Sequence, residues 1–165
     1  MIEIESVPAD HSALRRAFGC FPSGVTAVCA LVDGVPVGMA ASSFTSVSMD
    51  PPLVSVCVQD SSTTWPKLRE RPRLGLSVLA EGHDAACTSL SSKHGDRFAG
   101  VDWEATTDDA VYVRGSTVWL DCSVEREVPA GDHAIVLLRI HGLRARPDTA
   151  PLVFHGSRFR TLAAV

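Results

Sequence analysis

Short runs of β-branched and apolar residues dominate the pattern along the chain, and turns rich in glycine, proline and hydroxyl-bearing residues separate them. Runs of this length and composition predict β-strands. The Asp33-Gly34 pair is typical of a hairpin between two of them. We expect about seven short strands, over residues 25–32, 35–40, 53–58, 74–79, 118–125, 133–143 and 151–155.

Helical patterns are few and short. The pattern predicts helices over residues 9–19, 63–70 and 84–92, the second with Pro66 in its first turn. Residues 93–100 and 102–110 are expected to form a polar loop and an irregular loop. Many strands with few helices predict a mainly β protein built as an antiparallel barrel rather than a parallel nucleotide-binding sheet, whose glycine fingerprint is absent. At 165 residues, the chain is expected to form a single domain over residues 1–165.

Composition and charge exclude several classes of function. The formal net charge is −4 and no cluster of lysine and arginine stands out, so binding to nucleic acid is not expected. The five cysteines are widely spaced and form no C-x-x-C pair, and the histidines lack ligand spacing, so no metal site is expected. The pattern contains no membrane span and no signal peptide, which predicts a cytoplasmic location.

Two hydroxyl-rich turns, residues 42–46 and 61–64, lie on either side of one predicted strand. Because they are joined through that strand, the two turns could line the same pocket, where hydroxyl and amide groups suit a phosphate or a polar heterocycle. The alternative is that the serines of the first turn satisfy their own backbone and that Ser62 or Thr63 caps the following helix. Cys57, in the strand between them, could face the same pocket or be a small buried residue.

From about Arg15 to Leu162, the chain resembles the flavin reductase-like family, the reductase components of two-component flavin monooxygenases. No one piece of the sequence is specific, but the order and spacing of the pieces are. The resemblance is carried by Phe21-Pro-Ser-Gly-Val-Thr26, Gly38 to Phe44, Ser46-Val-Ser-Met-Asp-Pro-Pro-Leu-Val54, Ser62 with Thr64, Arg97-Phe-Ala-Gly-Val-Asp-Trp103, Gly131-Asp-His133 and Pro151-Leu-Val-Phe-His-Gly156.

This resemblance implies a fold and an activity. The fold would be a split antiparallel β-barrel that forms a homodimer, with flavin bound near the dimer interface. The activity would be hydride transfer from NADH or NADPH to FMN or FAD, with the reduced flavin passed to a partner oxygenase component. NADH is favoured over NADPH because no arginine cluster is evident for a 2′-phosphate.

The resemblance also assigns candidate binding residues. Backbone amides and the Ser42 hydroxyl would contact the edge of the flavin ring and the ribityl chain, and Ser62 and Thr64 would hold the flavin phosphate at the start of the helix with Pro66. The full first group is Ser42, Ser43, Phe44, Thr45 and Ser46.

Arg97, Phe98 and His133 complete the candidate site. Arg97 could pair with phosphate, and Phe98 could stack on a ring, although a surface arginine beside a buried anchoring phenylalanine fits the same pattern. His133, which follows Gly131 and Asp132, would bind the nicotinamide amide or lie over the reacting rings, with Asp132 orienting it. We therefore predict an NAD(P)H:flavin oxidoreductase. The alternatives are a flavin-binding protein of the same fold without reductase activity, and a dimeric barrel with a vestigial pocket.

Overall fold

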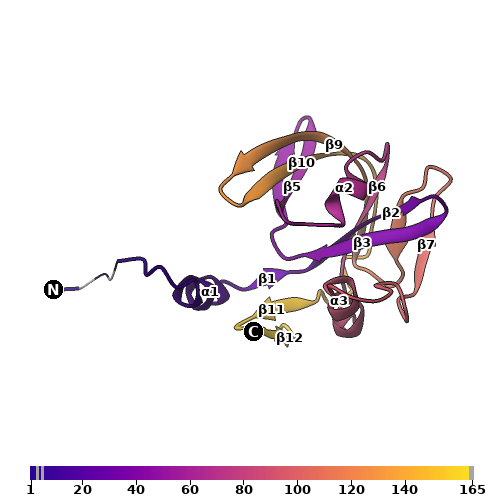
Figure 1. The fold of residues 1–165 in the computed structure, drawn as a ribbon. Coiled ribbons are helices and arrows are strands. Elements are labelled where there is room, and N and C mark those ends of the chain that lie inside the picture. Colours follow the sequence, from indigo (N-terminus) through magenta and orange to yellow (C-terminus); the bar gives the residue numbers. More distant parts are fainter. Residues whose placement is uncertain (3, 5, 164–165) are drawn as a thin grey trace.

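The computed structural model describes residues 1–2, 4 and 6–163, and most of the regular structure is antiparallel sheet (Figure 1). A seven-stranded sheet in the order β3-β2-β6-β9-β10-β5-β4 forms the barrel, and β1-β11-β12 and β7-β8 form two small sheets beside it. The elements are α1 (Ser12–Gly19), β1 (Ser23–Gly24), β2 (Thr26–Val32), β3 (Val35–Ala41), β4 (Thr45–Met49), β5 (Pro52–Gln59), α2 (Trp65–Leu68), β6 (Leu74–Val78), α3 (Asp84–Leu90), β7 (Trp103–Ala105), β8 (Val111–Val113), β9 (Val118–Ala130), β10 (His133–Ala145), β11 (Val153–His155) and β12 (Arg158–Arg160).

The expected fold class, a mainly β split antiparallel barrel with a few short helices, is confirmed. The strand count of about seven is wrong, because twelve strands lie within the described residues. Strand β4 begins within the first hydroxyl-rich turn and pairs with β5. Strands β9 and β10 extend to Ala130 and Ala145, further than predicted, since they pair with each other along almost their whole length.

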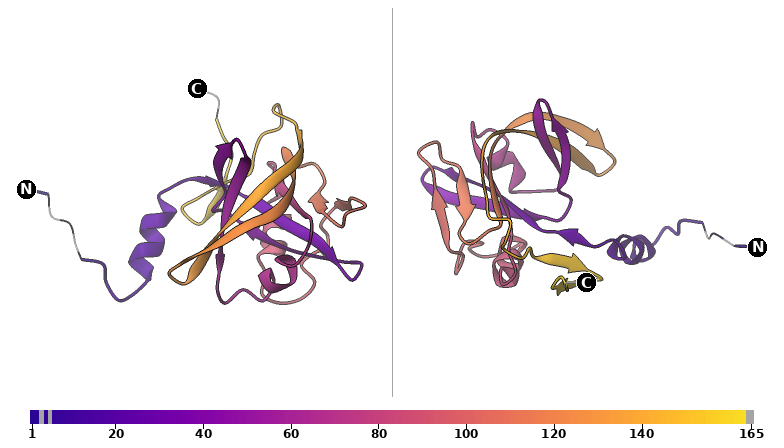
Figure 2. Two further views of the ribbon diagram at one scale, coloured as in Figure 1. Left: turned by 90° about the horizontal axis from the view of Figure 1, so that it is seen from above. Right: turned by 180° about the vertical axis from the view of Figure 1, so that it is seen from behind.

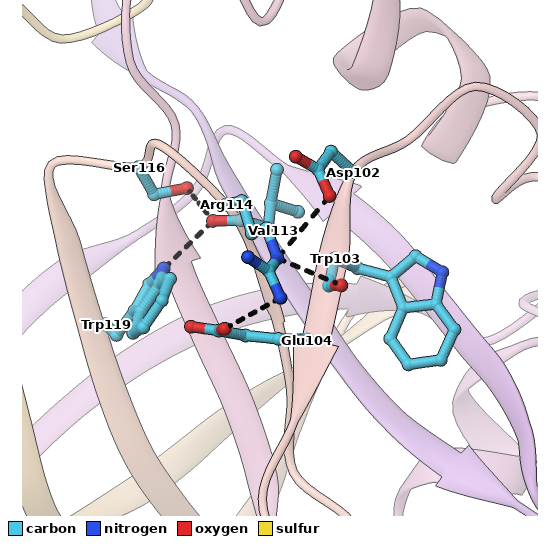
Figure 3. A network of polar contacts seen from close by, with 7 residues as sticks. All are labelled: Asp102, Trp103, Glu104, Val113, Arg114, Ser116 and Trp119. Carbon is cyan, nitrogen blue, oxygen red and sulfur yellow. Dashed lines mark hydrogen bonds and ion pairs between the residues drawn. The ribbon is translucent and has the colours of Figure 1, made fainter.

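The irregular loop expected over residues 102–110 is also wrong, because β7 within it pairs with β8. Figure 3 shows the polar contacts that hold this hairpin together. The Arg114 guanidinium lies 3.5 Å from Asp102 Oδ1 and 3.2 Å from Glu104 Oε2, and it donates a hydrogen bond to the Trp103 carbonyl. These contacts come from charged residues that a pattern of apolar positions does not detect.

Strand β2 separates two hydrophobic cores. Val28 and Ala30 point into the barrel core. Ala27 and Cys29, on the opposite face, pack into a second core with α3 and the β8 strand. Since successive side chains of a strand point to opposite faces, a strand covered on both sides reads as a continuous apolar run, as this segment does.

The register of β5 and β10 places polar residues on one outer face. Val54, Val56 and Val58 of β5 belong to the barrel core, so the alternate residues Cys57 and Gln59 face outward. Gln59 pairs directly with His133 of β10. Residues directly opposite each other in an antiparallel pair share a face. The outward face of β5 and β10 therefore carries the side chains of Gln59 and His133 next to each other.

The helices cover little of the barrel. Helix α1 lies beside it, joined through β1, and has no buried residue (Figures 1 and 2). Helix α2 spans four residues rather than the eight predicted, but it contributes the buried Trp65 and Leu68 to the barrel core. No helix among the described residues is long and apolar enough to cross a membrane.

Candidate functional site

A polar cavity with a volume of about 610 Å³ lies where β3, β5, β10, the end of α3 and three loops meet. This volume falls within the range of roughly 300–1,000 Å³ that is typical of small-molecule sites. Its wall is rich in hydroxyl groups and carries three side chains that can bear positive charge. The lining residues are Met39, Ala40, Ala41, Ser42, Ser43, Cys57, Gln59, Ser61, Ser62, Thr63, Leu90, Ser91, Lys93, Arg97 and His133.

The two hydroxyl-rich turns converge on this cavity, as the sequence predicted. Ser42 and Ser43 from the first turn and Ser62 from the second turn all line it. Between them, the outward face of β5 contributes Cys57 to the wall. The expected shared pocket is therefore found, and flavin contacts by these residues stay a prediction.

Ser43 has a structural role within the wall. Its Oγ accepts a hydrogen bond from the Cys57 N–H at 2.8 Å and lies 3.3 Å from the Cys57 carbonyl oxygen. Strand β4 pairs with β5 as far as Ser55, so beyond that residue the Ser43 side chain takes the place of a neighbouring strand. The sequence left two roles open for this serine, contact with a ligand or satisfaction of nearby backbone. The hydrogen bonds of Ser43 are those of the second role.

Ser62 caps the second turn. Its Oγ accepts hydrogen bonds from the Trp65 N–H at 3.1 Å and the Thr64 N–H at 3.3 Å. Because α2 spans only four residues, few peptide dipoles are aligned there. A helix dipole there would therefore contribute less to anion binding than the predicted longer helix would.

Arg97 is held firmly at the other side of the cavity. Its Nη1 donates to the Gly38 carbonyl at 3.1 Å and to Thr64 Oγ1 at 2.9 Å. Thr64 itself is buried and faces an adjoining recess rather than the cavity. The predicted phosphate-binding pair is thus divided: Ser62 faces the cavity, whereas Thr64 positions Arg97.

His133 lines the cavity at the start of β10, next to the turn that contains Gly131. Its Nδ1 lies 2.7 Å from Asp132 Oδ1, a hydrogen bond that lowers the pKa of the Asp132 carboxyl. In the neutral ring, a carboxylate at this distance selects the tautomer that carries the proton on Nδ1. The Nε2 atom is then left for a ligand, which agrees with the predicted orienting role of Asp132.

Besides Thr64, four of the predicted residues lie outside the cavity wall. Phe44 packs against the barrel core, and Thr45 and Ser46 pair with β5 as part of β4, so none of these three lines the cavity. Phe98 is buried in the second core, with its ring edge-on to Trp103. It anchors its loop, which was the alternative reading of this residue, and its edge borders the recess beside the cavity.

Sequence reasoning missed several residues of the wall. Gln59 could have been found, because it alternates with Cys57 on the strand. Ser91 and Lys93 have no such signal, since they follow α3 and reach the cavity through the course of a loop. The described residues contain no group of three or more histidine, cysteine, aspartate and glutamate side chains that could hold a metal ion.

Comparison with known proteins identifies the family. The family described as "Flavin reductase like domain" matches residues 18–163. The chain belongs to the flavin reductase-like family. A flavin reductase of Pseudomonas putida is 34% identical over 164 residues, covering 99% of this chain and 96% of the relative. The reductase subunit HsaB of a flavin-dependent monooxygenase from Rhodococcus jostii (strain RHA1) is 33% identical, covering 91% of this chain and 77% of the relative.

Solved structures of the flavin reductase-like family support the same assignment. The NADH:FAD oxidoreductase SgcE6 of Streptomyces globisporus C-1027, in complex with NAD and FAD fragments, superposes with a TM-score of 0.90. It is 36% identical and covers 98% of each chain. The family, the fold and the enzyme class indicated by the sequence, a flavin reductase, are thereby confirmed.

The residues of the cavity fit a flavin and a nicotinamide. Hydroxyl and amide groups in the wall match the polar edge of an isoalloxazine ring, and Arg97 and Lys93 match a phosphate. Met39, Ala41 and Leu90 provide apolar surface for a flat ring. The chemistry of the donor set therefore agrees with the family.

Proposed function

We propose that this flavin reductase binds FMN or FAD in the cavity, takes hydride from NADH and passes the reduced flavin to a partner oxygenase. The observation that carries the proposal is the wall itself, where hydroxyls from two turns, a fixed arginine and an oriented histidine face one space. When both are bound, the flavin supplies the redox chemistry by accepting the hydride of the nicotinamide.

The chain's own residues position the reactants. Ser42 and the amides around it contact the polar edge of the ring, and Ser61 and Ser62 with Arg97 hold the phosphate. His133 presents Nε2 to the nicotinamide carboxamide and holds that ring against the flavin. Free reactants lose translational and rotational freedom when they come together to react. A site that already holds the two rings in reacting geometry can lower the barrier by roughly 7–11 kcal/mol at best.

Reduction places negative charge on the flavin, and the wall of the cavity stabilises it. Backbone N–H groups and the cations Lys93 and Arg97 favour the reduced anionic form over the neutral oxidised form. None of the described residues that line that wall is a carboxylate. The nearby Asp132 carboxylate is hydrogen-bonded to His133.

The proposal includes a homodimer. Helix α1 has no buried residue, and its Phe18 and the nearby Phe21 are 71% and 77% exposed. Large apolar side chains that gather on a surface are typical of an interaction site. A second copy of the chain that covers this helix would remove them from water.

Turnover of NADH with each flavin tests the proposal. Purified protein is expected to oxidise NADH when FMN or FAD is present and not in their absence, which is followed by nicotinamide absorbance. The variant His133→Ala is expected to lower kcat/KM for NADH on the order of 10- to 100-fold, because the ring loses its positioning contact. The variant His141→Ala serves as a matched control, since His141 is exposed on the same strand and hydrogen-bonds Ser123.

Two outcomes would contradict the proposal. Undiminished NADH turnover by His133→Ala would remove His133 from the site. Tight flavin binding without NADH or NADPH oxidation by the wild type would favour the alternative of a flavin-binding protein without reductase activity.

A further inference from the structure

A second recess of about 290 Å³ adjoins the main cavity. Thr63, Lys93 and Arg97 line both spaces, so the two adjoin at these three residues. The recess runs on from there toward Lys67 of α2 and the start of β3. His133 lines the main cavity and not the recess.

The recess concentrates positive charge in an acidic protein. The chain has a formal net charge of −4 and contains two lysines, Lys67 and Lys93. Both line this recess together with Arg97, and among its described lining residues Asp96 is the one carboxylate. Asp96 Oδ1 accepts the Phe98 N–H at 2.9 Å. Three cations and one carboxylate leave a local excess of two positive charges.

The arginine of the recess is preorganised. The Arg97 hydrogen bonds found among the described residues all use Nη1, which leaves the N–H groups of Nε and Nη2 for a ligand. Thr64, which accepts one of them, is 8% exposed. The other acceptor is the Gly38 carbonyl, and a Cβ at Gly38 would lie 3.0 Å from the Phe98 ring and 2.4 Å from Cys29 Sγ. The guanidinium is therefore fixed by groups that are themselves packed in place.

We propose that this recess binds the adenylate phosphate of FAD, and so makes the protein favour FAD over FMN. The inference rests on the proposed function, because the flavin must lie in the main cavity. Ser61, Ser62 and Arg97 meet the phosphate that FMN and FAD share, and Thr63 lines both spaces. A second phosphate joined to the first enters the recess and meets Lys67 and Lys93, with Arg97, which lines both spaces, in contact with both phosphates.

Flavin affinity measured without nicotinamide tests the recess separately from turnover. Dissociation constants for FAD, FMN and riboflavin are determined by equilibrium dialysis for the wild type and for Lys67→Gln, whose side chain lines the recess and not the main cavity. We expect about a 5- to 10-fold weaker binding of FAD, with FMN changed less than about twofold, since one charge-assisted contact is lost. The double variant Lys67→Gln/Lys93→Gln is expected to weaken FAD binding further, with part of the additional loss shared by FMN because Lys93 also lines the main cavity.

The matched control is Arg146→Gln, which removes an exposed cation that lines neither space. The affinity for FAD is also expected to fall more steeply with salt than the affinity for FMN, and this extra salt dependence is expected to vanish in the double variant. Equal weakening of FAD and FMN by Lys67→Gln would assign the recess to the shared phosphate and overturn the inference while leaving the proposed function intact.

A second result would also overturn it. In that result, both flavins bind the variants normally, and the KM for NADPH rises while the KM for NADH does not. The recess would then bind the 2′-phosphate of NADPH. Absence of any flavin binding by the wild type would instead remove the proposed function, and this inference with it.

Discussion

Ser43 shows how a residue in a binding wall can serve the fold. Its hydroxyl is committed to the backbone of Cys57, at a point where β5 has lost its neighbour β4. Ser42, one position earlier, is exposed to the cavity. Adjacent serines therefore have different tasks, and substitution can separate them.

Replacing Ser43 with alanine is expected to lower the free energy of unfolding by about 1–3 kcal/mol, because the Cys57 N–H then lacks a partner in a half-buried position. Urea denaturation measures the loss. In the control variant Ser42→Ala, stability should change by less than about 0.5 kcal/mol, as for an exposed side chain. Equal stabilities of the two variants would mean that water satisfies the Cys57 amide.

At the residue scale, the sequence predicted which turns meet but not what each hydroxyl does. Ser42, Ser43 and Ser62 were expected together and lie together. The sequence could not separate a ligand-facing hydroxyl from one that bonds the backbone, because both need the same side chain. Thr64 was expected to hold phosphate, yet its hydroxyl accepts from Arg97, a contact between residues 33 positions apart.

Among the elements, β2 and β8 carry much of the packing of the second core. Strand β8 crosses close to β6, and the Val113 N–H donates to Ser77 Oγ at 3.0 Å. Gly75 makes this approach possible, because a Cβ there would lie 2.1 Å from the Val111 carbonyl oxygen. The backbone of β8 cannot move away from a Cβ at position 75 as the end of a flexible side chain could.

The variant Gly75→Ala is therefore expected to be destabilised by about 3 kcal/mol, a cost typical of overpacking. Thermal unfolding followed by circular dichroism measures it. Gly24→Ala provides the comparison, since no atom lies within 4 Å of a Cβ at Gly24. A melting temperature of Gly75→Ala equal to that of Gly24→Ala would show that β8 can move away from β6 at little cost.

Sequence patterns predict long strands better than short ones. The runs that became β2 and β5 were recognised because valines and other apolar residues fill them. Strands of three residues such as β7 are too short to show a period, and charged contacts of Arg114 stabilise that hairpin. Strand β4 was hidden in a serine-rich turn, since four of its five residues are exposed.

At the scale of the whole molecule, the barrel class follows from the number of strands, and the family from the order of several short motifs. The candidate site required more, because its wall combines the end of β3, the outward face of β5, the start of β10 and the loop after α3. The position of that loop relative to the sheet depends on tertiary packing, such as Phe98 against Trp103. For this reason, the sequence did not indicate that Lys93 and Ser91 belong to the wall of the cavity.

The buried thiols make the whole fold sensitive to alkali. Burial raises the pKa of Cys29 and of Cys122 to about 12, and it raises the pKa of Tyr112 as well. The unfolded chain loses these protons at lower pH than the folded chain does. The stability that they contribute is therefore fully present below about pH 9 and is lost as the pH rises toward 12.

We expect the free energy of unfolding to fall by about 3 kcal/mol between about pH 8 and pH 10 from the two thiols together. Urea midpoints measured across this range test the expectation. The variant Cys29→Ala should show a shallower decline than the wild type, even though its stability at neutral pH is lower. Parallel curves for the two proteins would show that Cys29 titrates alike in both states.

The placement of both lysines beside one recess has a practical consequence for work with this protein. Apart from the amino terminus, amine-directed reagents such as succinimidyl dyes or activated resins find their targets at that one spot. Attachment through amines would thus obstruct the recess while sparing the rest of the surface. Coupling through the exposed Cys20 thiol uses a chemically different handle and leaves both lysine side chains unmodified.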